Sequence, residues 1–294
     1  MFDRILVPLD GSEMAEAVLT QVRRLLFRKD AEVLLVQAIG LPPAVESDLS
    51  TILAILQARA LEYLNGVGRR LSEQGARVRT FVRQGAPAET ILEVAEKEEA
   101  SLIAMSTHGR SGIARWVLGS VAEKVIRASP IPVLAVRSYE GAAPVGAKEL
   151  SLKKILVAID AADLSFEAIP PAIELARLFD ARVLLVNVCE GPECAVPVPQ
   201  MTHAFVRFRE AGLTVEPVMR VGDPASGILD ACTEHGADLV ALSTHGRSGV
   251  TRWVLGSVAE KVLRSATVPL LVVRNAPALR GKAGPEPRKQ EVNA

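Results

Sequence analysis

The chain has 294 residues, enough for two ordinary domains, and its 49% hydrophobic and 23% charged residues are typical of soluble globular proteins. The 34 Lys and Arg residues balance 34 Asp and Glu residues, so the overall charge gives no reason to expect nucleic acid or an anionic membrane as the main partner. No apolar leader precedes the opening MFDRILVPLD and no apolar run reaches about 18 residues, so we expect a soluble, cytoplasmic protein.

Short runs rich in Val, Ile and Leu recur along the first half: ILVPL, VLLVQAI, VRTFV, SLIAMS and IPVLAV. Their continuous apolar character is typical of buried parallel strands. Helical patterns separate these runs. The segment EMAEAVLTQVRRLLF places Met14, Val18, Val22 and Leu25 on one helical face, and Pro87 precedes a second helix, AETILEVAEKEEA. We therefore predict an α/β fold with an open parallel sheet and helices on both faces.

The second half of the chain repeats the first. RILVPLDGS at 4–12 matches KILVAIDAA at 154–162. STHGRSGIARWVLGSVAEKVIR at 106–127 matches STHGRSGVTRWVLGSVAEKVLR at 243–264 with only three differences. Matching residues are 150 positions apart in the first pair of segments and 137 apart in the second. The second copy is therefore 13 residues shorter between these points. The deficit falls where the first copy has a long helical pattern over 49–71.

Composition sets the predicted domain boundaries. SYEGAAPVGAKEL has the small, Pro- and Gly-containing composition of a linker, and PALRGKAGPEPRKQEVNA has no periodicity, which predicts disorder. We therefore assign a first domain to residues 1–137, a linker to 138–151, a second domain to 152–275 and a disordered tail to 276–294.

The repeated string leaves the end of the predicted strand SLIAMS and finishes at Gly119 and Ser120, where the helical pattern VAEKVIR begins. Ligands of doubly wound sheets bind at the carboxyl ends of the strands. A helix start presents unpaired N–H groups and the positive end of the helix dipole, which suit a phosphate chain. Gly109 and Gly112 would let the backbone approach such a ligand closely.

An alternative interpretation of the string is helix capping. Ser120 with Glu123, and Ser257 with Glu260, have the spacing of a capping box, in which each serine would be only an N-cap. Capping alone does not require the rest of the string to recur, so the repeat favours a ligand site.

The spacings Gly109-x9-Gly119-Ser120 and Gly246-x9-Gly256-Ser257 resemble the ATP motif G-x2-G-x9-G-(S/T) of the universal stress protein family, and ILVPLDGS resembles its first strand. The resemblance covers residues 2–137 and 152–275. It implies two tandem open parallel sheets, each of five strands in the order 3-2-1-4-5, with the nucleotide between the ends of the first and fourth strands.

The same resemblance implies the site residues. Asp10 and Asp160 match the aspartate near ribose and adenine, and Ala38 and Val188 match the position whose backbone meets adenine. The residues of the phosphate loop are Ser106, His108, Gly109, Arg110, Gly112, Gly119 and Ser120 in the first half and Ser243, His245, Gly246, Arg247, Gly249, Gly256 and Ser257 in the second. The two histidines either line the site or hydrogen-bond locally, and the two arginines either pair with phosphate or lie in solvent.

The chain departs from the family motif in two ways. The first motif glycine is Ser106 in one half and Ser243 in the other, and these side chains either crowd the phosphates or add a hydroxyl contact. The second half has DAAD where the first has DGSE, so the turn after Asp160 lacks a glycine. We expect the second site to be the weaker one.

The family resemblance implies an ATP-binding regulatory or stress-response module. The sequence shows no Walker lysine, no paired carboxylates and no nucleophile with a matched base, so we name no catalytic residue. Cys189 and Cys194 have no second ligand pair, and the three scattered cysteines fit a reducing cytosol, so we name no metal ligand either. Mg²⁺ would arrive with the nucleotide. Two alternatives stay open: a slow ATPase or nucleotidyl-transfer enzyme on the same fold, and an interaction module that has lost nucleotide binding.

The last strand of each half, IPVLAVR at 131–137 and VPLLVVR at 268–274, lies at a sheet edge in the order 3-2-1-4-5. A flat apolar edge favours pairing with another strand, and the family resemblance implies dimerisation through it. We expect the two strands of one chain to pair antiparallel as an intramolecular pseudo-dimer. Further association into a homodimer is left open.

Overall fold

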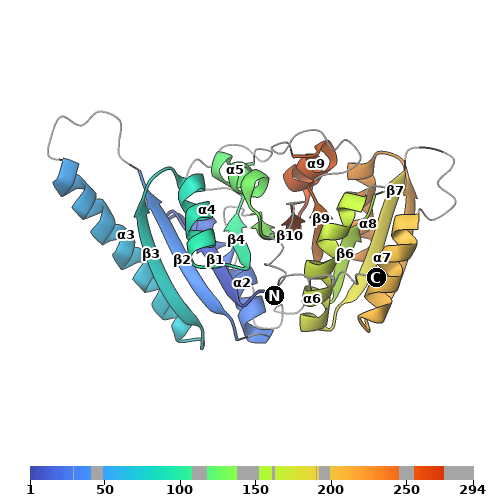
Figure 1. Ribbon diagram of the computed structural model, residues 1–294, viewed down its shortest axis with the longest axis horizontal. Coiled ribbons are helices and arrows are strands. Elements are labelled where there is room, and N and C mark those ends of the chain that lie inside the picture. The colour runs from blue at the N-terminus through green and yellow to red at the C-terminus, as the bar shows by residue number, and fades with distance from the viewer. Residues whose placement is uncertain are drawn as a thin grey trace, which may run out of the picture.

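The computed structural model describes residues 1–28, 30–40, 49–107, 118–137, 152–160, 163–189, 191, 199–244 and 255–274. Strands and helices alternate in both halves (Figure 1). The first half contains β1 (Arg4–Pro8), α1 (Glu13–Glu16), α2 (Leu19–Arg28), β2 (Glu32–Ile39), α3 (Leu49–Ser72), β3 (Arg77–Gln84), α4 (Pro87–Lys97), β4 (Leu102–Ser106), α5 (Ser120–Ala128) and β5 (Val133–Val136).

The second half repeats this order of elements. It contains β6 (Lys154–Ala158), the 3-10 helix η2 (Asp163–Ala168), α6 (Ile169–Phe179), β7 (Arg182–Cys189), α7 (Pro199–Glu210), β8 (Val215–Val221), α8 (Pro224–His235), β9 (Leu239–Ser243), α9 (Ser257–Ser265) and β10 (Leu270–Val273). The helix α3 has 24 residues and its counterpart α7 has 12, which accounts for most of the difference in length between the two copies.

The strands of the described residues form one sheet in the order β3-β2-β1-β4-β5-β10-β9-β6-β7-β8. Each half keeps the predicted order 3-2-1-4-5, and its strands are parallel. At the centre β5 and β10 pair antiparallel, with Val133 opposite Val272 and Ala135 opposite Leu270. The sequence predicted two five-stranded sheets, and this pairing joins them into one.

The sheet is buried on both faces, as the continuous apolar runs predict. In β1, Ile5 and Val7 face one core and Leu6 faces the other, all at 0% exposure. Helices α2, α3, α6 and α7 cover the first face, and α4, α5, α8 and α9 cover the second. The predicted helix after β1 is split into α1 and α2, although Val18 and Val22 are buried as expected.

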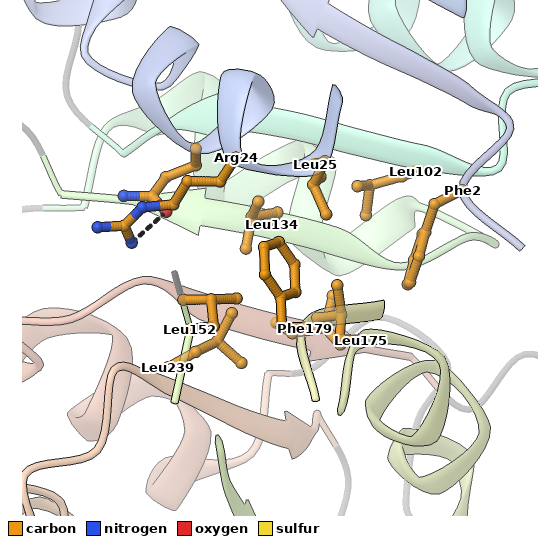
Figure 2. Close-up of a pocket in the computed structure, with 11 residues that line it drawn as sticks. Phe2, Arg24, Leu25, Leu102, Leu134, Leu152, Leu175, Phe179 and Leu239 are labelled. Atoms are coloured by element: carbon orange, nitrogen blue, oxygen red, sulfur yellow. Dashed lines mark hydrogen bonds between the residues drawn. The ribbon is translucent and has the colours of Figure 1, made fainter. Parts of the chain in front are cut away.

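The first core continues across the junction between the halves. Figure 2 shows Leu25 and Leu134 of the first half facing Leu152 and Phe179 of the second around a small, mostly apolar pocket. Arg24 lies at its margin. Since apolar side chains of both halves are buried together here, the halves share a hydrophobic core as well as a sheet.

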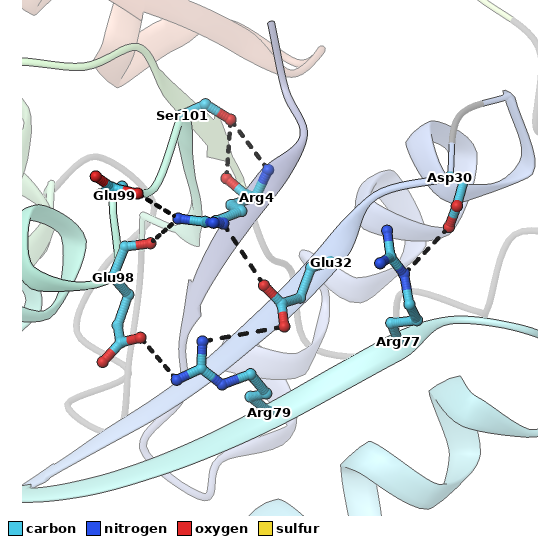
Figure 3. Close-up of polar contacts among 8 residues, drawn as sticks. All are labelled: Arg4, Asp30, Glu32, Arg77, Arg79, Glu98, Glu99 and Ser101. Atoms are coloured by element: carbon cyan, nitrogen blue, oxygen red, sulfur yellow. Dashed lines mark hydrogen bonds and ion pairs between the residues drawn. The ribbon is translucent and has the colours of Figure 1, made fainter.

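Ion pairs tie the amino ends of the strands in the first half (Figure 3). Arg4 contacts Glu99 at 2.8 Å and Glu32 at 3.7 Å, while Arg79 contacts Glu98 at 2.7 Å. Such partly exposed pairs contribute about 1 kcal/mol or less each. These pairs lie at the amino ends of the strands, whereas the candidate site lies at the carboxyl ends.

Among the described residues, no helix has both the length and the apolar character needed to cross a membrane. Cys189, at the end of β7, is disulfide-bonded, so the expectation of reduced cysteines is wrong at this residue.

Candidate functional site

The candidate site of each half lies at the carboxyl ends of the strands, where the sheet order reverses. In the first half β1 pairs with β2 on one side and β4 on the other, so the loops after β1 and β4 leave the sheet as neighbours. The second half repeats this arrangement with β6, β7 and β9. The carboxyl ends of the strands thus carry Asp10, Ala38 and Ser106 in the first half and Asp160, Val188 and Ser243 in the second.

Asp10 is held in a defined turn. Its Oδ1 accepts hydrogen bonds from the backbone N of Ser12 at 3.0 Å and from the Ser12 hydroxyl at 2.6 Å. The Ser12 hydroxyl in turn accepts from Ala15 N at 3.1 Å, so Ser12 caps α1. The loop that carries Asp10 is thereby fixed to the start of a helix. In the second half Ala162 stands at the position of Ser12, so the sequence has no hydroxyl there.

A polar cluster anchors α1, and therefore the Asp10 loop, to the long helix α3. Tyr63 donates its hydroxyl to Glu16 Oε1 at 3.0 Å, and Arg70 Nη2 contacts Glu16 Oε2 at 2.6 Å. Burial, and then the charge of Glu16, raises the pKa of Tyr63 well above its usual range. In the second half Phe166 replaces Glu16 and meets His203 edge-to-face, with ring centroids 5.1 Å apart. The partners in this cluster are 47 and 54 residues apart along the chain, so no local sequence pattern marks it.

Each half also has an amide side chain with a buried oxygen just before the predicted adenine position. Asn187 is 2% exposed and donates from Nδ2 to the carbonyl of Ile159 at 2.8 Å, so it holds the residue before Asp160 in place. Its Oδ1, and Oε1 of Gln37 at the equivalent position, are buried and make no hydrogen bond within the described residues. In the sequence, the only sign of these two residues is that each is polar within an otherwise apolar strand.

The serines that replace the first motif glycine lie at the ends of β4 and β9. Ser106 is 8% exposed, and the Ser243 hydroxyl is buried without a hydrogen-bond partner in the described part of the chain. A buried, unpaired hydroxyl costs about 1–3 kcal/mol, so a ligand or water oxygen that bonds to it would offset that cost. Thr107 and Thr244, the next residues, are 3% and 2% exposed.

The helices that follow β4 and β9 begin at glycine. Gly119 and Gly256 are the N-caps of α5 and α9, both in extended conformation and without a side-chain capping bond. Ser120 and Ser257 are the first residues of the helices and are exposed. The alternative interpretation of these serines as N-caps is therefore wrong. The first N–H groups of each helix have no intrahelical acceptor and face the same edge as the aspartate loops.

Glycine at the helix start also has a packing role. Gly119 N donates to Thr107 O, and Gly256 N donates to Thr244 O, each at 2.8 Å. A Cβ added at Gly256 would lie 2.7 Å from Thr244 O, closer than a side chain can approach a backbone oxygen. From the sequence, this glycine was predicted only to contact phosphate.

The centre of each phosphate loop lies outside the described residues. This applies to His108, Gly109, Arg110 and Gly112 of the first half and to His245, Gly246, Arg247 and Gly249 of the second. Within the described ranges, no three His, Cys, Asp or Glu side chains gather in a way that could hold a metal ion.

The chain is similar to known proteins over most of its length. A model of the universal stress protein family matches residues 1–137 and 200–274. A universal stress protein of Methanocaldococcus jannaschii is 34% identical over 141 residues, covering 47% of this chain and 83% of that protein. One from Mycolicibacterium smegmatis is 24% identical over 294 residues, covering 92% and 96%.

The fold has a close counterpart among solved structures. The crystal structure of a universal stress protein from Archaeoglobus fulgidus superposes with a TM-score of 0.76 at 22% identity, covering 94% of this chain and all of that one. At that identity the likeness shows the fold. The family model, which spans more than half of the chain, shows the kinship: the chain belongs to the universal stress protein family.

Proposed function

We propose that each half binds an adenine nucleotide, with ATP preferred, and that the chain works as a nucleotide-binding regulatory or stress-response module. The observation that carries this proposal is the pairing of two features at the point of sheet reversal. An aspartate follows β1 or β6 at the carboxyl end of the strand, and a glycine-started helix follows β4 or β9. The family motif accounts for both features.

The residues present fit a phosphate chain. The starts of α5 and α9 offer backbone N–H groups, the exposed hydroxyls of Ser120 and Ser257, and the positive ends of two helix dipoles. The unpaired Ser243 hydroxyl adds a donor at the strand end. Asp10, on the loop after the neighbouring strand, would accept from a ribose hydroxyl. Mg²⁺ would come with the phosphates, since no resident cation site is proposed.

The two sites are proposed to work as an intramolecular pseudo-dimer of domains 1–137 and 152–275, joined by the linker 138–151. The antiparallel register of β5 and β10 supports this arrangement. The same register implies that an approximate twofold axis relates the two sites. With β5 and β10 paired to each other, a homodimer of whole chains would need a different surface.

Nucleotide analysis tests the proposed ligand. The purified full-length chain is denatured, and released small molecules are identified by chromatography and mass spectrometry after incubation with mixed nucleotides and removal of the excess. We expect adenine nucleotides to be retained and guanine and pyrimidine nucleotides to be lost. Retention of none would favour the interaction-module alternative.

Phosphate release from ATP separates a binding module from a slow ATPase. The Gly119→Val variant, in which a branched side chain meets the helix start, serves as the control with an obstructed first site. Slower phosphate release by this variant than by the unsubstituted chain would support the ATPase alternative. We expect only background release in both proteins.

A further inference from the structure

Two arginines cross the junction between the halves in opposite directions. Arg274, which follows β10, donates from Nη1 to the carbonyl oxygen of Ala128, the last residue of α5, at 2.9 Å. Arg137, which follows β5, donates from Nη1 to the carbonyl oxygen of Arg264, next to the last residue of α9, at 2.9 Å. Each arginine thus caps a helix of the other half.

The capped helices are those that start at the candidate phosphate sites. The last carbonyls of a helix have no intrahelical donor, and a cation there opposes the negative end of the dipole. With nine residues each, α5 and α9 are short, so an anchor at the carboxyl end restrains the whole helix. The helix start is the end that would meet the nucleotide phosphates.

Backbone hydrogen bonds connect each arginine to the phosphate loop of its own half. In the first half Thr107 N donates to Val136 O at 2.9 Å, and Gly119 N donates to Thr107 O at 2.8 Å. Since Val136 directly precedes Arg137, the strand end that carries this arginine also holds the start of α5.

The second half has the same connections. Thr244 N donates to Val273 O at 3.0 Å, and Gly256 N donates to Thr244 O at 2.8 Å. Val273 directly precedes Arg274. The two helices, the two strand ends and the two arginines therefore form a closed ring of contacts around the junction, and the buried β5–β10 pairing lies at its centre.

We infer that Arg137 and Arg274 are positioning residues that act across the junction. Arg274 positions α5 for the nucleotide of the first half, and Arg137 positions α9 for the nucleotide of the second half. Each site is completed by the other half of the chain. This inference rests on the proposed function, because the helices are taken to hold a nucleotide.

The test measures each site separately in the full chain. Calorimetry with ATP is performed in a background of Asp160→Ala, which leaves the first site, or Asp10→Ala, which leaves the second. We expect Arg274→Gln to weaken the first site by about three- to tenfold, the range of a lost charge–dipole and hydrogen-bond contact, and to change the second by less than about twofold. Arg137→Gln should show the reverse pattern, so each variant is the matched control of the other. Arg→Lys, which keeps a donor, should restore part of the affinity.

If each arginine only stabilised its own half, its substitution would not weaken the site of the opposite half. If either arginine affects only the site of its own half, affects both sites equally or affects neither, the inference is wrong. Hydrogen exchange gives a readout that does not need the nucleotide. Arg274→Gln should speed exchange in α5 and Arg137→Gln in α9. If the unsubstituted chain binds no ATP, the proposed function fails, and a crossed exchange pattern still decides whether each arginine positions the opposite helix.

Discussion

The side chain near the end of the second strand of each half differs between the halves, and so does the residue of the helix that packs against it. Val188 is larger than its counterpart Ala38, and Gly227 of α8 stands where the first half has the buried Thr90. A Cβ at Gly227 would lie 2.7 Å from Val188 Cγ1. The small residue therefore accommodates the larger side chain beside the predicted adenine position.

This pairing predicts a coupled effect on stability. Gly227→Thr forces a side chain against Val188 and should lower the free energy of unfolding by about 1–3 kcal/mol, as overpacking does. Adding Val188→Ala recreates the pair of the first half and should restore most of that loss. Urea unfolding of the single and double variants measures the coupling. Additive effects would show that the two residues do not share one space.

At the scale of elements, the loops after β1 and β6 make the two halves unequal. Asp10 is held by Ser12, which also caps α1, whereas Asp160 has Ala162 at the equivalent position and is followed by the 3-10 helix η2. Ala161 also stands where Gly11 follows Asp10, so the second half departs from the family motif directly beside its predicted ribose-binding aspartate.

We therefore predict that the second site binds ATP more weakly than the first, by about three- to tenfold, the equivalent of about one hydrogen bond. Calorimetry of the full chain with Asp160→Ala reports the first site, and the Asp10→Ala variant reports the second. Equal affinities, or tighter binding by the second site, would contradict the prediction.

The contact between α3 and α1 predicts a pH dependence. Folding raises the pKa of Tyr63 above its unfolded value of about 10, chiefly by burial and then by Glu16. The resulting stability is fully present below about pH 10 and is lost as the pH rises through the folded-state pKa.

Ultraviolet titration of tyrosinate in the chain and in Tyr63→Phe isolates this residue from Tyr139, the second of the 2 tyrosines. The difference between the two titrations should appear only well above pH 10 and together with unfolding. A difference midpoint near the ordinary tyrosine pKa, with the fold intact, would contradict both the burial of Tyr63 and its contact with Glu16.

The elements were predictable from the sequence where the signal is local. Apolar runs marked the buried strands, and the length difference between the copies marked the long helix α3. Contacts between distant residues had no such signal. Tyr63 and Glu16 meet only because α3 lies over α1, and the arginine crossings depend on a register between two strands that no periodicity encodes. Gly256 was predicted from the family motif, but a glycine is also required there because a Cβ would collide with the carbonyl oxygen of Thr244.

At the scale of the whole molecule, the central antiparallel pair converts two tandem halves into one sheet with cores continuous on both faces. Val133 and Val272 are directly opposite each other and both face the core under α5 and α9. Cysteines at these two positions should therefore form an intramolecular disulfide at low protein concentration.

Peptide mapping after mild oxidation measures this crosslink in Val133→Cys/Val272→Cys. Val133→Cys/Leu270→Cys is the matched control, because Leu270 pairs with Ala135 and lies too far along the strand. Crosslinks only between separate chains, or equal yields in both variants, would contradict the register.

Calorimetric titration of the full chain with ATP tests the central claim, nucleotide binding by each half, most directly. The account predicts one ATP for each half with unequal affinities, loss of both in Asp10→Ala/Asp160→Ala, and unchanged binding in Asp230→Ala, which removes a carboxylate from an exposed position of α8. No binding by the unsubstituted chain, or undiminished binding by the double variant, would contradict it.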